Sequence, residues 1–475
     1  MIHLTAEQQA ILDCPPAKSI KVAAGAGCGK TSTLVAYGER WSKRGLYLAF
    51  NKAIADEARR KFPPHIETRT AHSFAFRALD IGQRGNLVAR FRFEHLRDYD
   101  DMIVAVPGMT DGQVRASILR TLENFLIDEG SKIKVEHCVL ENTTQRNAVR
   151  KMVQGIAGKL LRFQKHDLPI THDAYLKAFE LWHRIEGDFD YLLLDEAQDL
   201  NPVLISIARK SRLPTVVMGD AYQSIYRFRG AVNAMAQFKA EEFPLTQSWR
   251  FGSDVASLAN SILSHHSTPP RRLLRGHPGQ ETEVLRYTGR VPGGARTAIL
   301  ARTNARLFES LAGLDRPFHL LGGIADLQRQ LSSAFALRHR HLHKVTDDSV
   351  ARFTSWHAFD EAANKGDGEA RRLRDIVDKH GTDLPALLDK LGRLHRPNEA
   401  DAQIIVSTAH KAKGREFDTV VVLDDFELPS TQVKRRQAAP AMAGETDQMI
   451  NLLYVAATRA TRRLLLAEKL YDELV

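Results

Sequence analysis

Residues 20–41 carry the feature that most constrains the fold of this chain. The apolar run Ile20–Ala24 leads into Gly25-Ala26-Gly27-Cys28-Gly29-Lys30-Thr31, and a segment of helical character, Ser32–Trp41, follows. A strand, a glycine-rich loop and a helix in this order are the context in which G-x-x-x-x-G-K-[S/T] forms a phosphate-binding loop. Glycines let successive backbone N–H groups converge on a polyphosphate, and the helix N-terminus adds a positive dipole end. The other interpretation is a glycine-rich turn that binds no ligand.

The two polar side chains of this loop have distinct expected roles. Lys30 is expected to reach the β- and γ-phosphates of a nucleotide, and the Thr31 hydroxyl is expected to bind Mg²⁺. The residues expected to surround the phosphates are Gly25, Ala26, Gly27, Cys28, Gly29, Lys30 and Thr31.

A second candidate for phosphate chemistry follows the apolar run that ends at Leu194. Asp195 and Glu196 come directly after that run, so they are expected at the carboxyl edge of a sheet, where α/β folds bind ligands. Asp195 is suited to hold Mg²⁺, directly or through water, and Glu196 to orient and deprotonate an attacking water. Two acids after a strand are weak evidence alone. Together with the loop at Gly25–Thr31 they fit ATP hydrolysis, which needs both a phosphate cradle and a metal carboxylate.

Residues 222–231 interleave aromatic and basic side chains. Tyr226, Phe228 and Arg229 follow a strand-like run that ends near Asp220. Aromatic rings next to arginines suit a stacking platform for single-stranded nucleic acid. The other interpretation is a core-facing aromatic pair with solvated arginines.

Composition bounds the class of protein. The 475 residues are enough for several domains, and 43% hydrophobic with 26% charged residues is typical of a soluble globular protein. No apolar run approaches bilayer length and the N-terminus does not resemble a signal peptide, so we expect a cytoplasmic, nucleoid-associated protein without a membrane partner. The three scattered cysteines favour neither a disulfide framework nor a zinc cluster. The net charge of +10 favours a polyanionic partner without identifying one.

Strand and helix patterns alternate twice along the chain, which predicts an α/β fold with parallel sheets flanked by helices. The first alternation includes a strand at Leu46–Phe50 and is interrupted by helical sequence from about residue 82 to 186. The second begins after Thr246 and is interrupted by helical sequence from about residue 326 to 400, where Arg338-His339-Arg340-His341 indicates a basic surface rather than metal ligands. Strands of the second alternation are expected at Glu283–Tyr287, Thr297–Ala301, Ile404–Thr408, Thr419–Leu423 and Arg463–Leu466.

These motifs, in this order, resemble superfamily 1 DNA helicases of the UvrD/Rep/PcrA type. The details are most similar to the F-box DNA helicase branch, although we recognise no F-box segment in the sequence. The segments that carry the resemblance are Leu4-Thr5 with Gln8, Ala24–Thr31, Phe50-Asn51-Lys52, Thr70–Ser73, Leu194–Asp199, Gly219–Ala231, Gln247–Arg250, Ala301–Asn304, Thr408–Phe417 and Asn451–Ala460.

The resemblance implies two RecA-like P-loop NTPase motor domains with helical insertions, the second reduced. The implied boundaries are 1–83 with 185–246 for the first motor domain and 84–184 for its insertion. They are 247–345 with 400–475 for the second motor domain and 346–399 for a short remnant of its insertion.

Further nucleotide contacts are implied by the resemblance alone. Gln8 would read the adenine edge, Trp249 would stack on the base and Glu416 would hold the ribose. Ser32 stands where many relatives carry an arginine near the adenine. The catalytic residues implied around ATP and Mg²⁺ are Lys30, Asp195, Glu196, Gln223 and the arginine fingers Arg250 and Arg459.

The implied activity is that of an ATP-dependent helicase or translocase on single-stranded DNA and single-strand/duplex junctions, moving 3′ to 5′. It would serve DNA repair, recombination or defence. The DNA-facing positions of the family correspond to Phe50, Asn51, His72, Tyr226, Phe228, Arg229, Arg302 and His410.

Two other functions stay open at this point. The second insertion has little room before Ile404, so the chain could act as a DNA-activated ATPase switch that recruits or gates a nuclease or recombination partner. An RNA-directed enzyme is the third interpretation.

Overall fold

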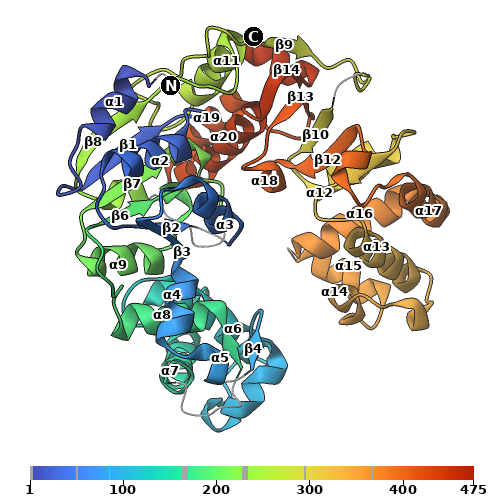
Figure 1. The fold of residues 1–475 in the computed structure, drawn as a ribbon. Coiled ribbons are helices and arrows are strands. Elements are labelled where there is room, and N and C mark those ends of the chain that lie inside the picture. The colour runs from blue at the N-terminus through green and yellow to red at the C-terminus, as the bar shows by residue number, and fades with distance from the viewer. Residues whose placement is uncertain are drawn as a thin grey trace. The chain divides into compact units, whose positions relative to one another are not determined.

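The structure, a computed structural model, describes residues 4–49, 52–84, 86–162, 169–226, 234–293, 296–365 and 367–475. The chain forms two compact units, Met1–Thr246 and Gln247–Val475. Each unit contains a six-stranded sheet in which all paired strands are parallel (Figure 1). The predicted α/β class with parallel sheets flanked by helices is therefore confirmed.

The sheet of the first unit has the strand order β3-β2-β6-β7-β1-β8. Because β7 lies between β6 and β1, the segments that follow these three strands meet at one carboxyl edge. The strands are β1 (Ile20–Ala24), β2 (Gly45–Ala49), β3 (Ile66–Thr70), β6 (Tyr191–Leu194), β7 (Thr215–Gly219) and β8 (Glu241–Leu245). The associated helices are α1 (Ala6–Leu12), α2 (Lys30–Arg40), α3 (Lys52–Lys61), α9 (Pro202–Ser211) and α10 (Ala234–Gln237).

Residues between β3 and β6 form the helical part that the sequence predicts. It contains α4 (Ala71–Ala78), α5 (Ile81–Arg84), α6 (Asp111–Ile127), α7 (Thr143–Leu160) and α8 (His172–Trp182), with a short parallel pair of β4 (Leu87–Val88) and β5 (Ile170–Thr171). One hydrophobic core joins this part to helix α9 of the sheet layer, through buried side chains that include Ile118, Phe125, Val153, Phe179 and Val203.

A buried ion network fixes the helical part to the sheet layer. The Lys177 and Glu180 side chains on α8 are fully buried, and Lys177 Nζ lies 3.1 Å from Glu180 Oε2 and 2.6 Å from the Asp128 carbonyl oxygen. Helix α9 contributes the Ser206 hydroxyl and the Lys210 ammonium, which donate to Glu180 Oε1 at 2.7 and 2.6 Å. Burial opposes the charge of Glu180, but hydrogen bonds from Lys210 and Ser206 outweigh it and lower the Glu180 pKa.

The sheet of the second unit has the order β11-β12-β10-β13-β14-β9. Its strands are β9 (Glu283–Arg286), β10 (Thr297–Ala301), β11 (Phe318–Leu320), β12 (Ile404–Thr408), β13 (Phe417–Val422) and β14 (Ala460–Leu466). The helices near this sheet are α11 (Ser253–Ser264), α12 (Asn304–Ala312), α18 (Ala409–Ala412), α19 (Pro429–Ala438), α20 (Ala443–Ala457) and α21 (Glu468–Leu474).

The second helical part, between β11 and β12, also shares a core with its sheet. Leu331, Phe359 and Leu391 pack in one buried cluster with Ile299 and Phe318 of the strands. The helices are α13 (Ala325–Arg338), α14 (Asp348–Ala351), α15 (Trp356–Asn364), α16 (Gly368–His380) and α17 (Leu384–Leu394).

Besides small shifts of strand ends and the short pair β4–β5, sequence and structure differ at three places. Helix α2 begins at Lys30 rather than Ser32, because Gly29 is its N-cap. Strand β8 was not predicted, because it contains two acidic residues and Pro244. Proline has no backbone N–H to donate to a neighbouring strand, but β8 lies at the edge of the sheet, where this loss is tolerated. The three-residue strand β11 was also missed, because it is too short to show a period.

Glu180→Gln is expected to destabilise the first unit strongly. The substitution removes the charge that balances buried Lys177, and breaking a buried pair in this way costs about 3 kcal/mol or more. Scanning calorimetry of the full chain measures the effect. The matched control is Glu57→Gln, which removes an exposed ion pair with Lys61 and should cost about 0.5 kcal/mol or less. Equal shifts for the two variants would contradict the structural role of the network.

Candidate nucleotide and nucleic-acid sites

The loop between β1 and α2 has the backbone geometry of an anion cradle. Gly27 and Gly29 have φ values of 71° and 74°, which non-glycine residues rarely adopt. The Gly25 N–H donates to the Leu245 carbonyl oxygen at 2.9 Å, so the loop is anchored to the end of β8. No side chain caps α2 at Gly29. The start of this helix therefore presents its backbone N–H groups in the arrangement that binds phosphate.

Asp195 joins the end of β6 to this loop. Its Oδ2 accepts a hydrogen bond from the Thr31 hydroxyl at 3.0 Å and another from the Tyr47 hydroxyl at 3.1 Å. Its Oδ1 accepts from the Glu196 N–H at 2.8 Å. Glu196 has a φ of 50°, a left-handed conformation that turns the chain sharply where β6 ends. The Asp195 carboxylate is thus hydrogen-bonded at both oxygens, and the Thr31 and Tyr47 hydroxyl groups lie beside Oδ2.

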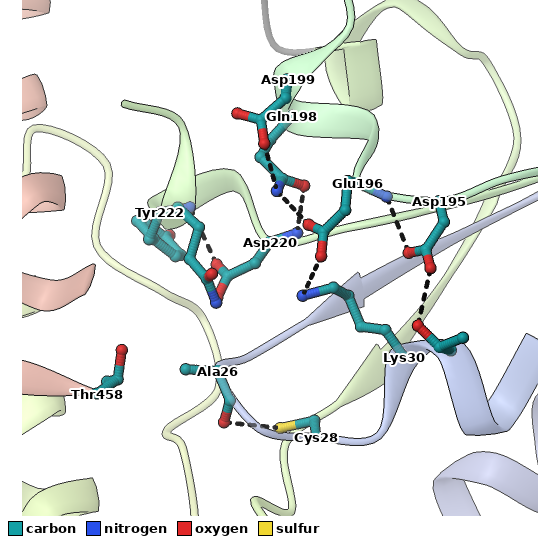
Figure 2. A network of polar contacts seen from close by, with 12 residues as sticks. Ala26, Cys28, Lys30, Asp195, Glu196, Gln198, Asp199, Asp220, Tyr222 and Thr458 are labelled. Atoms are coloured by element: carbon teal, nitrogen blue, oxygen red, sulfur yellow. Dashed lines mark hydrogen bonds and ion pairs between the residues drawn. The ribbon is translucent and has the colours of Figure 1, made fainter. Parts of the chain in front are cut away.

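A chain of polar contacts runs from the loop to β7 (Figure 2). Lys30 Nζ lies 3.6 Å from Glu196 Oε1, and Gln198 Nε2 donates to Glu196 Oε2 at 2.5 Å. The other end of the Gln198 amide, Oε1, accepts from the Asp220 N–H at 3.0 Å. Gln223 Nε2 donates to Asp220 Oδ2 at 2.8 Å. The predicted residues Lys30, Glu196 and Gln223 therefore belong to one network.

Burial controls the charge of two groups in this site. It raises the pKa of Asp195, and the neighbouring Glu196 carboxylate raises it further, while Lys30 opposes both. Burial also raises the pKa of the Cys28 thiol to about 12. Cys28 Sγ lies 3.8 Å from the Ala26 carbonyl oxygen and its side chain is 2% exposed, so the thiol is part of the loop's packing.

The residues present fit Mg²⁺. Mg²⁺ prefers hard oxygen ligands, and the Thr31 hydroxyl and the Asp195 carboxylate already lie 3.0 Å apart at the loop. A cation there would favour the ionised form of Asp195 that burial opposes. Within the described ranges no group of three or more His, Cys, Asp or Glu gathers into a metal cluster.

Gln8 lies next to helix α2, and its side-chain amide forms hydrogen bonds to residues of the first unit. Gln8 Nε2 donates to the Thr33 hydroxyl at 3.0 Å, and Gln8 Oε1 accepts from the Thr5 N–H at 3.0 Å. The Thr5 hydroxyl accepts from the Gln8 N–H, so Thr5 and Gln8 form a capping box at the start of α1. Ser32, on the first turn of α2, is exposed.

In the second unit, Arg250 and Glu416 are ion partners. Arg250 Nε lies 2.7 Å from Glu416 Oε1, and one terminal nitrogen donates to the Thr458 carbonyl oxygen at 2.9 Å. The Trp249 ring is 43% exposed and its centroid lies 5.1 Å from that of His277. An exposed indole with a ring partner is a suitable stacking surface for a base.

The other predicted residues of the second unit are more enclosed. Arg459 is 1% exposed, and its guanidinium donates to the carbonyl oxygens of Val455 and Arg415 at 2.9 and 3.3 Å. Arg302 Nε donates to the Asp425 carbonyl oxygen at 2.7 Å. His410 is half-buried on α18.

His72 lines a basic and aromatic cavity of about 730 Å³ in the first unit. Its ring centroid lies 6.1 Å from that of His172 and 6.0 Å from that of Tyr175, both on α8. Burial and the nearby His172 lower the pKa of His72 to about 4, so its ring is neutral at pH 7. The remaining lining residues are Lys52, Arg69, Thr70, Ser73, Phe76 and Arg77.

Four of the predicted DNA-facing residues lie outside the described residues, namely Phe50, Asn51, Phe228 and Arg229. Tyr226, at the end of a described range, is half-buried. The stacking platform expected around residues 226–229 therefore stays a prediction.

Sequence reasoning missed several residues of both sites. Tyr47 reads as an ordinary strand residue, and only the sheet order brings its hydroxyl to Asp195. Gln198 and Asp220 lie within the segments Leu194–Asp199 and Gly219–Ala231 that carry the family resemblance. A polar residue shortly after an apolar strand indicates a candidate site residue, so both could have been found from the sequence. His172 and Tyr175 carried no signal, because their relation to His72 depends on how α8 packs against α4.

Comparison with known proteins identifies the family. The UvrD/REP helicase N-terminal domain matches residues 4–244, and the UvrD-like helicase C-terminal domain matches residues 324–470. F-box DNA helicase 1 of Gallus gallus is 31% identical over 99% of this chain and 49% of its own length. F-box DNA helicase protein 1 of Schizosaccharomyces pombe is 30% identical over 98% of this chain and 58% of its own length. A solved arterivirus nonstructural protein 10 helicase with DNA covers 96% of this chain and 63% of its own, at 12% identity and a TM-score of 0.34.

The chain belongs to the UvrD-like family of DNA helicases. The resemblance on the sequence motifs, including the F-box branch, is confirmed. The chain spans about half the length of these F-box relatives. Among the described residues, no helix combines the length and apolar character needed to cross a bilayer.

Cys28 is expected to resist alkylation in the native protein. With a pKa of about 12, only about 10⁻⁴ of the thiol is ionised at pH 8, and the thiolate is the reactive form. Treatment with iodoacetamide at pH 8, followed by peptide mass spectrometry, measures the modification of each cysteine. The same treatment in denaturant is the control, where all three cysteines should react. Equal rates for Cys28 in both conditions would show that the loop is open to solvent.

Proposed function

We propose that this chain is an ATP-driven motor that moves along single-stranded DNA, 3′ to 5′, and separates duplex at junctions in DNA repair, recombination or defence. The observation that carries the proposal is the polar network that joins Lys30 and Thr31 of the loop to Asp195, Glu196 and Gln223 at one sheet edge. Membership of a DNA helicase family supports DNA as the polymer.

In the proposed reaction, the loop N–H groups and Lys30 bind the phosphates of ATP. Thr31 and Asp195 would hold Mg²⁺, which supplies positive charge to the polyphosphate. Glu196 accepts a proton from the attacking water, and the hydrogen bond from Gln198 holds its carboxylate in position for that transfer. Lys30 must exchange its contact with Glu196 for a phosphate, which leaves the carboxylate available to the water.

We further propose that the second unit contributes to the same nucleotide. Trp249 would stack on the base, and Arg250 and Arg459 would stabilise charge on the transferred phosphoryl group. Glu416 would hold the ribose. The ion pair between Arg250 and Glu416 implies an exchange, since each residue would leave the other for its own part of the nucleotide. Gln8 and Ser32 would contact the adenine side.

For DNA, the cavity around His72 has suitable chemistry. Arg69, Arg77 and Lys52 can accompany phosphates, while the His72 and Phe76 rings can stack on bases. Because the His72 ring is neutral at pH 7, its contribution is stacking rather than charge. Tyr226, Arg302 and His410 are proposed as further DNA contacts, with Phe50, Asn51, Phe228 and Arg229.

Single-stranded DNA is expected to stimulate ATP hydrolysis strongly. Lys30→Ala should abolish turnover by removing the phosphate ligand. Glu196→Gln should keep ATP binding and lower turnover by about 10²–10⁴-fold, the usual contribution of a general base. The measurements are steady-state phosphate release and nucleotide binding, with Lys61→Ala on the exposed end of α3 as the control.

Turnover that does not respond to DNA would refute the motor. RNA that stimulates better than DNA would instead favour an RNA-directed enzyme. Unwinding of 3′-tailed against 5′-tailed duplexes tests direction. Stimulated hydrolysis without movement on either substrate would favour the second candidate, an ATPase switch that recruits or gates a nuclease or recombination partner.

Phe76→Ala is expected to weaken binding of single-stranded DNA. Phe76 lines the cavity and is 38% exposed, and loss of one base–aromatic stack corresponds to about 1–3 kcal/mol, or about 5- to 150-fold in affinity. Fluorescence anisotropy with labelled oligo(dT) at fixed salt measures it. Trp182→Ala is the control, since Trp182 is an exposed aromatic on α8 outside the cavity. An unchanged affinity for Phe76→Ala would remove the cavity from the DNA path.

A further inference from the structure

A second cavity, of about 770 Å³, lies in the helical part of the second unit. It is formed where the end of α13 and the segment after it face α15 and α16. None of its residues belongs to the nucleotide or DNA sites described above. Its lining residues are Leu337, Arg338, Arg340, Leu342, Thr354, Ser355, Trp356, His357, Asp360 and Asp378.

One side of this cavity is apolar and rigid. The half-buried Trp356 ring stacks on buried Phe359, with ring centroids 5.0 Å apart and an angle of 25° between the rings. The Arg338 guanidinium lies 4.9 Å from the Trp356 ring centroid. Leu342 is 56% exposed, although it is a large hydrophobic residue. An indole held by its neighbours and an exposed leucine offer a place for one large apolar side chain.

Among the residues that the structure describes, the ion pairs of this cavity leave one arginine without an acidic partner. Arg338 lies 3.6 Å from the Asp378 carboxylate, and Asp360 lies 2.9 Å from Arg374. Arg340, in contrast, makes no side-chain hydrogen bond and no ion pair with any residue that the structure describes, and its side chain is exposed. A guanidinium in this position can receive a carboxylate through two parallel hydrogen bonds.

The backbone at Arg340 closes helix α13. Its φ is 61°, and the His341 N–H donates to the Ala336 carbonyl oxygen at 2.8 Å while the Arg340 N–H donates to the Leu337 carbonyl oxygen at 3.2 Å, the Schellman arrangement that ends many helices. Glycine is the usual residue at this position because it adopts the left-handed conformation more readily. The helix end therefore explains the conformation, and it places the Arg340 guanidinium beside the cavity without an ion partner among the described residues.

We propose that this cavity binds an extended peptide of a partner protein, in which an acidic residue stands next to a large apolar one. Arg340 receives the carboxylate, and Trp356 with Leu342 receives the apolar side chain. Arg338 and Arg374 are already paired with Asp378 and Asp360, so among the described residues Arg340 is the cavity arginine that can receive a new anion. One guanidinium beside an apolar surface matches a peptide with a single carboxylate and a large apolar side chain better than a strand that carries successive phosphates.

The experiment uses the full chain labelled with 5-fluorotryptophan and ¹⁹F NMR. The four tryptophans give four resonances, and the Trp356→Phe variant assigns that of Trp356. The probe is the peptide acetyl-Gly-Asp-Phe-Gly-amide. Its controls are the same peptide with Asn in place of Asp, the peptide with Ala in place of Phe, and oligo(dT).

The expected result is a saturable shift of the Trp356 resonance with the Asp-Phe peptide and a much weaker one with either peptide control. Arg340→Gly should weaken binding by about tenfold or more, because it removes the charge-assisted hydrogen bonds. It should not lower the melting temperature, since glycine relaxes the left-handed backbone. Arg393→Gln, an exposed arginine on α17 outside the cavity, is the matched control and should bind normally.

Three results would overturn the proposal. The first is no shift of Trp356 with the peptide, and the second is an equal shift with the Asn peptide. The third is a shift with oligo(dT) alone, which would make the cavity a nucleic-acid contact. If Arg340→Gly proves unstable, the shifts of the Trp356 resonance caused by the Asp and Asn peptides in the unmodified chain still show whether the cavity requires a carboxylate. DNA-stimulated hydrolysis should be unchanged in Arg340→Gly, so this test is independent of the motor proposal.

Discussion

The hydrogen bond between Thr31 and Asp195 is the contact on which the candidate nucleotide site depends. It joins residues 164 positions apart in the chain, one at the start of α2 and the other at the end of β6. The strand order β6-β7-β1 makes the contact possible, because parallel strands bring the following segments to one edge. Asp220, which follows β7, completes the link between them through Gln198. The glycine-rich loop, the candidate metal carboxylate and the candidate general base are thus adjacent because of topology rather than sequence proximity.

Two cations of the candidate nucleotide site form ion pairs with carboxylates that have their own proposed roles in that site. Lys30 contacts Glu196, and Arg250 contacts Glu416. In each pair the cation is mostly shielded from solvent, with 11% of the Lys30 and 12% of the Arg250 side chain exposed, whereas Glu416 is exposed. In the proposed mechanism each contact breaks when a phosphate arrives, so affinity for nucleotide would reflect a difference between two sets of charge pairs. A substitution that removes either member changes the free state as well as the bound one.

Much of the fold could be predicted from the sequence, and the reasons differ by element. Buried parallel strands such as β6, β10 and β12 are mainly apolar runs, and the glycine-rich loop has a fixed spacing. The Thr5 capping box is a local interaction and was likewise predictable. Strand β8 was not, because its acidic residues and Pro244 are tolerated only at an edge. Tyr47, His172 and Tyr175 could not be assigned, since their roles come from tertiary packing.

The buried ion network on α8 has a mechanical consequence. Helix α8 carries His172 and Tyr175 at its first turns and Lys177 and Glu180 further along, and Ser206 and Lys210 of α9 bind Glu180. Helix α9 begins at Pro202, shortly after the Asp195–Asp199 segment. A tensile load applied at the aromatic cavity would therefore pass along α8 to the buried Glu180 carboxylate, and from there through Ser206 and the partly exposed Lys210 to the helix that follows the candidate catalytic carboxylates. Direct side-chain contacts between two helices give such a load a short path, whereas a loop would absorb it.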